Sequence, residues 1–563
     1  MATWEQKDGP LSETMQTKEE FSDQTGDIIE TDPHNKLHRG LKSRHITMIA
    51  IGGAIGTGLI IGTGAALARA GPGSVFISYL IVGFVVWIVM SALGEMAAWL
   101  PLASGFTGYA VRFCDPALGF ALGYSYYCKY IIITPNQLTA AALVISYWVK
   151  RDVVNPGVWI TIFLILIVSI NYFGIKFFGE FEFWLSSFKV VIILGIMLLT
   201  FILALGGGPD HDRKGFRYWK DPGAFNTYIK GGSAGRFLAF WSTMVQATFA
   251  YLGTELVGVT VGEAQNPRKT IPRAIKLTFY RILFFYCLSI LFLGMVVPFN
   301  HPDLLFANKS SNSASASPFV VAIQIAGIKV LPSIFNGCIL IFVFSAANSD
   351  LYIATRTIYG LAREGKAPAI LARTNRSGVP IYALALSTCF ALLAYLNVSD
   401  DSKVVFGYFV NLVTMFGLLS WISILVTHIY FVRARRAQNV PETSLAFKAP
   451  LGLAGSYGAC AFCILIAITK SFNVFVPSPK TYGNFDYKNF ITSYLGLPVF
   501  LILLFGYKFY TKCKGVKPEE ADLWSGKEEI DREEAEFLAQ ETLKREQNGD
   551  AGWFYRTFVS WLF

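Results

Sequence analysis

The stretch HITMIAIGGAIGTGLIIGTG (residues 45–64) decides the fold, because it is apolar enough to enter a membrane yet rich in the residue that weakens helices. Gly52, Gly53, Gly56 and Gly58 fall within seven consecutive residues. Each glycine disfavours a helix by roughly 1 kcal/mol relative to alanine. The pattern therefore predicts a membrane helix that is interrupted in its first half.

A second interrupted segment, YLGTELVG (residues 251–258), lies inside a later apolar run and places Glu255 between two glycines. Glycine-interrupted segments at corresponding positions of two halves indicate a binding site near the middle of the membrane. Glycines spaced four apart, such as Gly52 and Gly56, also allow two helices to pack closely. Because the two segments occupy the first and sixth spans, we favour the binding site.

The chemistry of such a site follows from unwound backbone, which is tolerated at that depth only where it faces protein or a polar cavity. Free N–H groups at the start of a half-helix favour a carboxylate. Free carbonyl groups at the end of the preceding half-helix favour an ammonium group. The two breaks together predict a site for a small zwitterion, and an amino acid is the obvious candidate.

Composition supports a membrane protein, because 53% of the 563 residues are hydrophobic and only 15% are charged. Soluble proteins carry about 25% charged residues. The net charge of +10 does not indicate a nucleic-acid partner, since Lys and Arg gather mainly in alternate connections, where they set orientation. The basic connections predict that both termini are cytoplasmic.

The fold class predicted is an all-α polytopic membrane protein with twelve transmembrane helices. The apolar runs lie near residues 46–70, 75–98, 117–148, 157–175, 184–206, 237–261, 278–298, 331–361, 380–397, 404–432, 453–475 and 490–510. A disordered tail (1–44) precedes them, a loop (207–236) separates spans five and six, and a charged tail (511–563) follows. No cleavable signal peptide is visible.

Catalytic and metal-binding signatures are missing from the sequence. There is no HExxH, GxSxG or phosphate-binding GxxxxGK[ST] motif, so we expect neither an enzyme nor a cofactor. Cys460 and Cys463 form a CxxC pair, but no second pair completes a zinc set, and no metal is expected.

Several long motifs resemble the fungal amino-acid permeases of the amino acid–polyamine–organocation superfamily. They are the opening stretch, SALGEMAAWLP (91–101), GEFEFWLSSFKV (179–190), GTELVGVTVGEAQNPRKTIPRAIK (253–276) and SAANSDLYIATRTIYGLAREGKAP (345–368). The resemblance covers residues 40–510. Within that family, the chain is most similar to the dicarboxylic amino-acid permeases. YYCKYIIITPNQLTAAALVISYW (126–148), GGGPDHDRKGFRYWKDPGAF (206–225) and the C-terminal tail carry this narrower likeness.

The resemblance implies a LeuT-like inverted repeat, with helices 1–5 (45–206) and 6–10 (237–432) as the two repeats, 433–510 holding two extra helices, and helices 1 and 6 discontinuous. It also implies proton-coupled uptake of glutamate and aspartate by alternating access at the plasma membrane. Residues matching the family's carboxylate-binding turn are Gly56, Thr57 and Gly58. Carbonyls matching its ammonium site belong to Ala54, Phe249 and Leu252, with Tyr251 between them.

Charged and polar groups within span three add a substrate hypothesis. Lys129 and Asn136 are seven residues apart, which places them within about 20° on one helix face. We expect both to face the cavity, with Lys129 binding the substrate's side-chain carboxylate. Snorkelling or pairing with a nearby protein carboxylate is the alternative for Lys129. Many permeases that resemble this chain have glutamate at the position of Gln137, and its absence here also favours an anionic substrate.

Proton coupling requires an ionisable group, and the resemblance points to Glu255 for coupling and gating. Lys189 in span five is a second candidate, because an ammonium that gains and loses a proton could replace a coupling ion. A lysine that snorkels to the cytoplasmic edge is the alternative. Asp350 and Arg356 in span eight are expected to balance each other's charge.

Partners expected beyond substrate and protons are membrane lipids and ubiquitin-ligase adaptors acting on tail lysines such as Lys18, Lys36 and Lys42. The runner-up function is a broad neutral amino-acid permease, and a nutrient receptor without net transport is the alternative of a different class.

Overall fold

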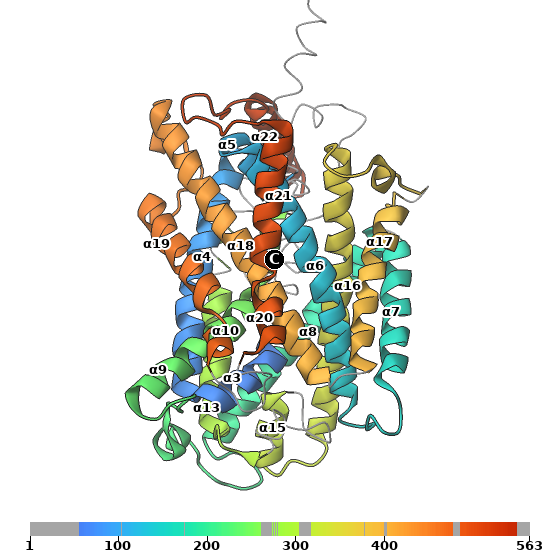
Figure 1. The fold of residues 1–563 in the computed structure, drawn as a ribbon, viewed down its shortest axis with the longest axis vertical. Coiled ribbons are helices and arrows are strands. Elements are labelled where there is room, and N and C mark those ends of the chain that lie inside the picture. Colours follow the sequence, from blue (N-terminus) through green and yellow to red (C-terminus); the bar gives the residue numbers. More distant parts are fainter. Residues whose placement is uncertain are drawn as a thin grey trace, which may run out of the picture.

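A computed structural model describes residues 56–102, 104–173, 175–259, 273, 275, 277, 280–302, 304, 317–375, 378–398, 402–476 and 485–548. Within them the chain is helical apart from turns and loops. The helices form an elongated bundle whose long members run parallel to its axis (Figure 1).

The bundle helices are η2 (Gly58–Gly62), α3 (Thr63–Ala70), α4 (Pro72–Trp99), α6 (Pro116–Ile145), α7 (Pro156–Tyr172), α8 (Ile175–Ala204), α9 (Gly232–Ser242), α10 (Met244–Tyr251), α11 (Leu256–Val259), η5 (Ile282–Leu288), α13 (Ser289–Val296), α16 (Leu331–Arg363), α17 (Ile381–Ala391), η7 (Leu392–Val398), α18 (Ser402–Ala437), α19 (Gly452–Thr469), α20 (Tyr487–Tyr494) and α21 (Gly496–Thr511). Helices at the ends of the bundle are α5 (Phe106–Phe113), η3 (Trp219–Gly223), α15 (Pro318–Ile325), η6 (Ala369–Ala372), η8 (Glu442–Ser444), η9 (Phe472–Phe475) and α22 (Lys527–Asn548).

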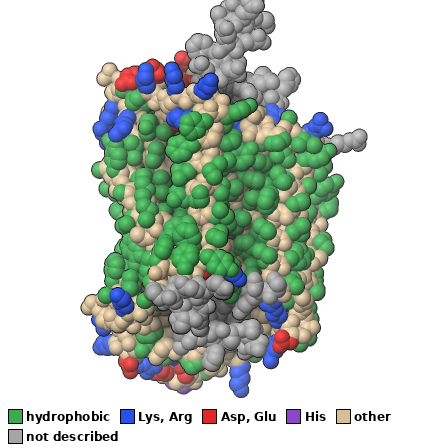
Figure 2. Space-filling model, viewed as in Figure 1, with side chains coloured by type: hydrophobic (Ala, Val, Ile, Leu, Met, Phe, Trp, Pro, Cys, Tyr) green, Lys and Arg blue, Asp and Glu red, His purple; other side chains and the backbone are tan. Residues whose placement is uncertain are grey.

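These helices confirm the predicted all-α polytopic membrane fold. Among the described residues, 8 helices are long and apolar enough to cross a membrane, and three shorter apolar helices accompany them: Gly58–Ala70, Pro156–Tyr172 and Ile282–Val296. Figure 2 shows an apolar belt around the middle of the molecule, with charged side chains gathered at its two ends. Large apolar side chains such as Trp184 (70% exposed) and Phe509 (80% exposed) lie on its outer surface, as expected for contact with lipid.

Local sequence explains where the long helices begin. Proline occupies the first turn of α4, α6, α7 and α16, where its missing N–H costs nothing. The Asp115 side chain caps α6 by accepting a hydrogen bond from the Ala117 amide at 2.8 Å. Asn155 caps α7 in the same way, through the Gly157 amide at 2.8 Å. These caps define the residues at which the two helices begin.

Three long helices form the centre of the bundle. Helix α6 packs along both α16 and α18, while α4 packs against α10, α13 and α18. Helices α7 and α17 lie together at one edge of the bundle, as Figure 1 shows. The polar face of α6 is therefore directed into the protein rather than toward lipid.

The break predicted in span six is present. Helix α10 ends at Tyr251, Leu252 is extended (φ −62°, ψ 139°), and Gly253 has a φ of +100°. That conformation is one that residues with a Cβ rarely adopt. Helix α11 then begins at Leu256. For the first span, the structure describes Gly56 and Thr57 leading into η2, and residues 45–55 lie outside the described part.

Candidate substrate site

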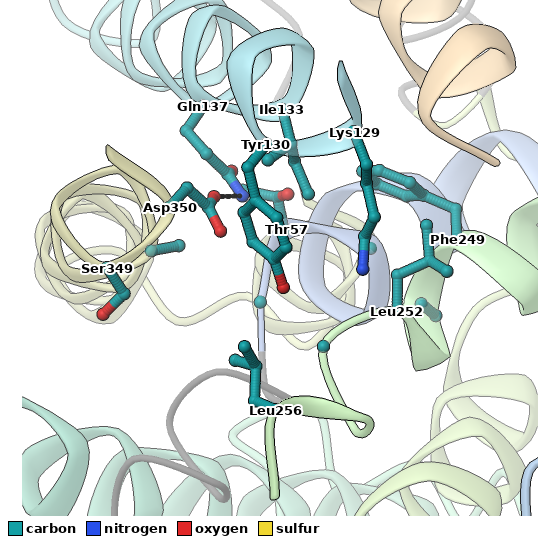
Figure 3. Close-up of a pocket in the computed structure, with 15 residues that line it drawn as sticks. Thr57, Lys129, Tyr130, Ile133, Gln137, Phe249, Leu252, Leu256, Ser349 and Asp350 are labelled. Carbon is teal, nitrogen blue, oxygen red and sulfur yellow. Dashed lines mark hydrogen bonds between the residues drawn. The ribbon is translucent and has the colours of Figure 1, made fainter. Parts of the chain in front are cut away.

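A cavity lies between the start of η2 and the break after α10. The empty space within it is about 470 Å³, a figure that includes solvent at its open side. Helices α6 and α16 complete its wall (Figure 3). The lining residues are Gly56, Thr57, Gly58, Lys129, Tyr130, Ile133, Gln137, Phe249, Ala250, Leu252, Gly253, Leu256, Ala346, Ser349 and Asp350.

The two interrupted segments touch each other at Gly58. A Cβ at this position would lie 2.5 Å from the Ala250 Cα and 3.1 Å from a ring carbon of Phe249. Any side chain at Gly58 would therefore push η2 away from α10. The glycine allows the backbones of the first and sixth spans to meet at the cavity.

The start of η2 offers groups suited to an anion. The first N–H groups of a helix have no partner within the helix and carry the positive end of its dipole. Thr57, at the cap of η2, is 2% exposed, and its hydroxyl has no hydrogen-bond partner among the described residues. A carboxylate placed here could accept hydrogen bonds from both kinds of donor.

Phe249 covers the opposite side of this turn. Its side chain is buried and meets Phe406 edge-on, with the ring centroids 6.2 Å apart. Leu252, three residues later, packs closely against Gly417 of α18. A Cβ on Gly417 would lie only 2.2 Å from the Leu252 Cδ2. Phe249 and Leu252 therefore place apolar side chains around the end of α10, and the Phe249 carbonyl accepts a hydrogen bond from the Leu252 amide at 3.3 Å.

Lys129 reaches the cavity from α6 and forms an ion pair with Glu255. The two side chains are 1% and 0% exposed. The Lys129 ammonium also lies over the rings of Tyr126 and Tyr130, at 5.0 and 4.7 Å from their centroids. The lysine is thus held by a protein carboxylate, which is the alternative that the sequence left open.

Glu255 connects Lys129 to the broken helix. Its other carboxylate oxygen accepts hydrogen bonds from the Gly253 amide at 3.1 Å and from the Trp421 indole at 3.4 Å. The residues between α10 and α11 are therefore stabilised by the same carboxylate that pairs with Lys129. Loss of this ion pair would therefore also change the contacts of the residues between α10 and α11.

Gln137 and Asn136 differ in position. Gln137 lines the cavity, and its amide nitrogen donates a hydrogen bond to Asp350 at 3.1 Å. Asn136 is fully buried but does not line the cavity, and neither atom of its amide group has a partner among the described residues. The expected stripe therefore enters the cavity wall at Lys129 but not at Asn136.

Lys189 is fully buried, and its ammonium lies 3.7 Å from a carboxylate oxygen of Glu182. The Ser345 hydroxyl, from α16, donates to the same oxygen at 2.7 Å. Lys189 does not line the cavity and does not snorkel to an edge, because its side chain has no exposed surface. It lies in a buried polar cluster between α8 and α16, behind the cavity wall.

Tyr251 does not line the cavity either. Its hydroxyl donates to the Tyr79 carbonyl at 2.9 Å, and its ring stacks on Tyr286 at 4.6 Å. These contacts anchor the end of α10 against α4 and η5. Ala54 lies outside the described residues.

Sequence reasoning missed Tyr130 and Ser349 and gave Asp350 a different partner. Asp350 and Arg356 are six residues apart, which places them about 120° apart around α16. Asp350 instead faces Gln137, while the Arg356 guanidinium lies over the Tyr352 ring at 5.3 Å. An acidic residue inside an apolar span was itself the available signal for a functional site.

The chain is similar to known transporters along most of its length. Residues 45–518 match the family described as Amino acid permease. A dicarboxylic amino acid permease of Saccharomyces cerevisiae is 56% identical, over 94% of this chain and 88% of its own. A proline-specific permease of Emericella nidulans is 38% identical, over 95% of both chains.

Solved structures extend the likeness to the fold. A crystal structure of the Eremococcus coleocola manganese transporter superposes with a TM-score of 0.52. It covers 83% of this chain and 93% of that chain at 12% identity. This similarity shows a shared LeuT-like fold and carries nothing about substrate.

Proposed function

The chain belongs to the amino acid permease family, a family of membrane transporters, and from this premise we propose that it imports L-glutamate and L-aspartate together with protons. The observation that most directly supports an acidic substrate is Lys129, a buried cation in the wall of the cavity at the broken helices. The 56% identity to a dicarboxylic amino acid permease supports the same class of substrate.

The two ends common to all amino acids are proposed to bind backbone. The α-carboxylate would accept hydrogen bonds from the amides around Gly56, Thr57 and Gly58. The α-ammonium would face the carbonyls of Ala54, Phe249 and Leu252, with the Phe249 ring closing over it. Gln137 would shape the polar side of the cavity, while Asn136 and Tyr251 act from behind its wall.

The side-chain carboxylate is proposed to exchange places with Glu255. An anionic substrate near the Lys129 ammonium would compete with Glu255 for the same charge, and charge-assisted hydrogen bonds are strong in a buried site. Glu255, once released, would no longer hold the Gly253 amide in its present position. Substrate binding would thus act on the break in the sixth span, which supplies a gate for alternating access.

Protons are proposed to drive the import. Glutamate carries one net negative charge, and moving one charge against the membrane potential costs about 2.3 kcal/mol per 100 mV. A single accompanying proton removes this cost, and a second would make the potential favour uptake. Lys189, paired with Glu182 inside the bundle, is a candidate for one of the proton-binding groups.

Cellular placement and partners follow the same proposal. The protein would lie in the plasma membrane among lipids, with both termini cytoplasmic and with ubiquitin-ligase adaptors acting on its tails. The two repeats would span 45–206 and 237–432, separated by an extracellular loop at 207–236. A tail at 1–44 would precede them, and 433–510 and the tail at 511–563 would follow.

Uptake of radiolabelled L-glutamate in cells lacking their own permeases tests this function, with all common amino acids as competitors. Strong competition by aspartate and glutamate alone is the expected result. Equal competition by neutral amino acids would indicate a broad neutral permease. Saturable binding without accumulation inside the cell would indicate a receptor.

A further inference from the structure

Asp350 lies in the middle of α16 and lines the cavity. In the view of Figure 3 it lies beside Gln137 on one side of the cavity, while Lys129 and Phe249 lie on the other. Its side chain accepts the Gln137 hydrogen bond at 3.1 Å. The proposed function leaves this carboxyl group without a role.

The other acids buried in the bundle are compensated by cations. Glu255 pairs with Lys129 and Glu182 pairs with Lys189. Among the described residues, no lysine, arginine or histidine nitrogen lies within ion-pair distance of Asp350. A buried carboxylate without a counter-ion is unstable, and taking up a proton is the simplest way to remove its charge.

Gln137 can serve Asp350 in both protonation states. Its amide nitrogen donates to a carboxylate, as the structure shows. Its amide oxygen is buried and has no partner among the described residues, so a rotated amide could accept a hydrogen bond from a protonated carboxyl. The contact can therefore persist while the proton comes and goes.

Other titratable groups surround Asp350 from the helices packed on α16. Lys129, Tyr126 and Tyr130 come from α6, and Glu182 and Lys189 come from α8. Each lysine is already paired with its own glutamate, so neither is a dedicated counter-ion for Asp350. The charge that changes when substrate arrives is that of the substrate.

We propose that Asp350 binds one of the protons that enter with an acidic amino acid. This inference rests on the proposed function and assigns a group to its coupling step. An anionic substrate beside a charged Asp350 would be repelled, so protonation and substrate binding favour each other, and by linkage each raises the affinity for the other. The proton is taken from the outside and released to the inside after the substrate has left.

The test uses the purified full-length chain in liposomes, with proton and glutamate fluxes measured together. Asp350→Asn keeps the size of the side chain and a hydrogen bond to Gln137 but cannot take up a proton. We expect the ratio of protons to glutamate to fall by one. We also expect exchange of labelled for unlabelled glutamate to continue, and Asp350→Glu to restore the original ratio.

Gln137→Glu supplies a second readout that does not depend on Asp350→Asn folding. Two neighbouring carboxyl groups hold a shared proton more tightly than one. The pH at which glutamate binding is half-lost should therefore rise by at least about one unit, a tenfold change in proton affinity. Asp212→Asn, in the loop after α8, serves as the control and should change neither readout.

Three outcomes separate this inference from the function on which it rests. If the unmodified protein moves no protons with glutamate, both are overturned. If it does, and the ratio is unchanged in Asp350→Asn, the assignment of Asp350 is overturned and proton coupling stands. If Asp350→Asn does not fold, an unshifted pH dependence in Gln137→Glu overturns the assignment.

Discussion

Lys129 and Glu255 are the residues on which selectivity depends in this account. Both are buried, and each is stabilised chiefly by the charge of the other. Breaking a buried ion pair by removing one partner costs roughly 3–5 kcal/mol, because the remaining charge is left without compensation. The pair therefore depends on both charges, and a competing carboxylate near Lys129 would disturb it.

Replacing Lys129 with methionine should abolish the preference for glutamate over its neutral analogue glutamine. A charge-assisted hydrogen bond contributes about 1.5–3 kcal/mol, so the ratio of the two affinities should fall by at least about tenfold. Competition against labelled substrate measures the ratio. Lys508→Met removes a half-exposed lysine that pairs with Asp115 at the far end of α21, so it controls for the loss of a cation away from the cavity and should leave the ratio unchanged.

A second substitution should restore the folding of this variant. Lys129→Met leaves Glu255 buried without its cation, so less folded protein should be recovered. Adding Glu255→Gln should restore the yield but not the preference for glutamate, as size-exclusion chromatography and the competition assay would show. A folded Lys129→Met protein with unaltered affinity and selectivity for glutamate would disprove the role of the lysine.

At the scale of elements, the break in the sixth span depends on glycine in two ways. Gly253 adopts a φ of +100°, and Gly58 removes the side chain that would otherwise separate η2 from α10. The first is a conformational requirement and the second is a requirement of space. Both were predictable as helix-weakening positions, but the contact across the two spans was not.

Gly58→Ala should reduce glutamate affinity strongly while the protein still inserts. The added methyl group would lie 2.5 Å from the Ala250 Cα, so the two segments must separate and the carboxylate site must widen. Overpacking of this kind costs typically about 1–3 kcal/mol, which corresponds to roughly 5- to 150-fold in affinity if it falls on binding. Labelled glutamate binding to purified protein measures the change.

The control for this prediction is Gly337→Ala in α16, where an added Cβ would meet nothing within 4 Å. Alanine in an open helical position stabilises a helix by roughly 0.5–1 kcal/mol relative to glycine. This variant should bind glutamate as the unmodified protein does and melt at a slightly higher temperature. Equal binding by both variants would show that the close approach at Gly58 is not needed.

Hydropathy and glycine placement were sufficient to predict the helices and the second break, because both depend on local properties of the chain. Pairing between helices was not predictable in the same way. Ser345 meets Glu182 and Asp350 meets Gln137 because α6, α8 and α16 pack at particular rotations. Those rotations depend on the shapes of many side chains, which no single motif records.

At the scale of the whole molecule, the segment after α21 crosses the end of the bundle and binds three of its elements. Arg112 of α5 forms an ion pair with Asp522 at 2.8 Å and donates to the Ser525 carbonyl at 2.6 Å. The Trp99 indole donates to the Leu523 carbonyl at 2.9 Å, and Gln438 donates to the Ala521 carbonyl at 2.6 Å. This segment joins the ends of α4, α5 and α18.

Removing the Arg112 side chain should release this segment. Arg112→Ala deletes the ion pair and leaves the Asp522 and Ser525 carbonyl groups without their donor, so limited proteolysis should cut between 512 and 527 much faster. Lys517→Ala, whose side chain is 71% exposed, is the control and should cut no faster than the unmodified chain. Equal resistance of Arg112→Ala would show that the contact is dispensable.

Lowering the pH should release the segment after α21, but only below the usual pKa of an aspartate. Burial favours the protonated form of Asp522, but hydrogen bonds from Ser525 and the charge of Arg112 outweigh it, so the pKa of Asp522 is lowered. A lowered pKa contributes stability above the usual aspartate value of about 3.9, and this is lost as the pH falls through the folded value. Proteolysis with an acid-active protease should therefore show protection at pH 5 and cleavage only below the usual aspartate value of about 3.9. Release already at pH 6 would contradict this.

A structure of the protein with L-glutamate bound tests the central claim most directly. The account predicts the α-carboxylate at the amides around Gly56, Thr57 and Gly58, and the side-chain carboxylate beside Lys129 with Glu255 displaced. Glutamate bound elsewhere, or bound with the Lys129–Glu255 pair intact and its side chain pointing away from Lys129, would contradict it.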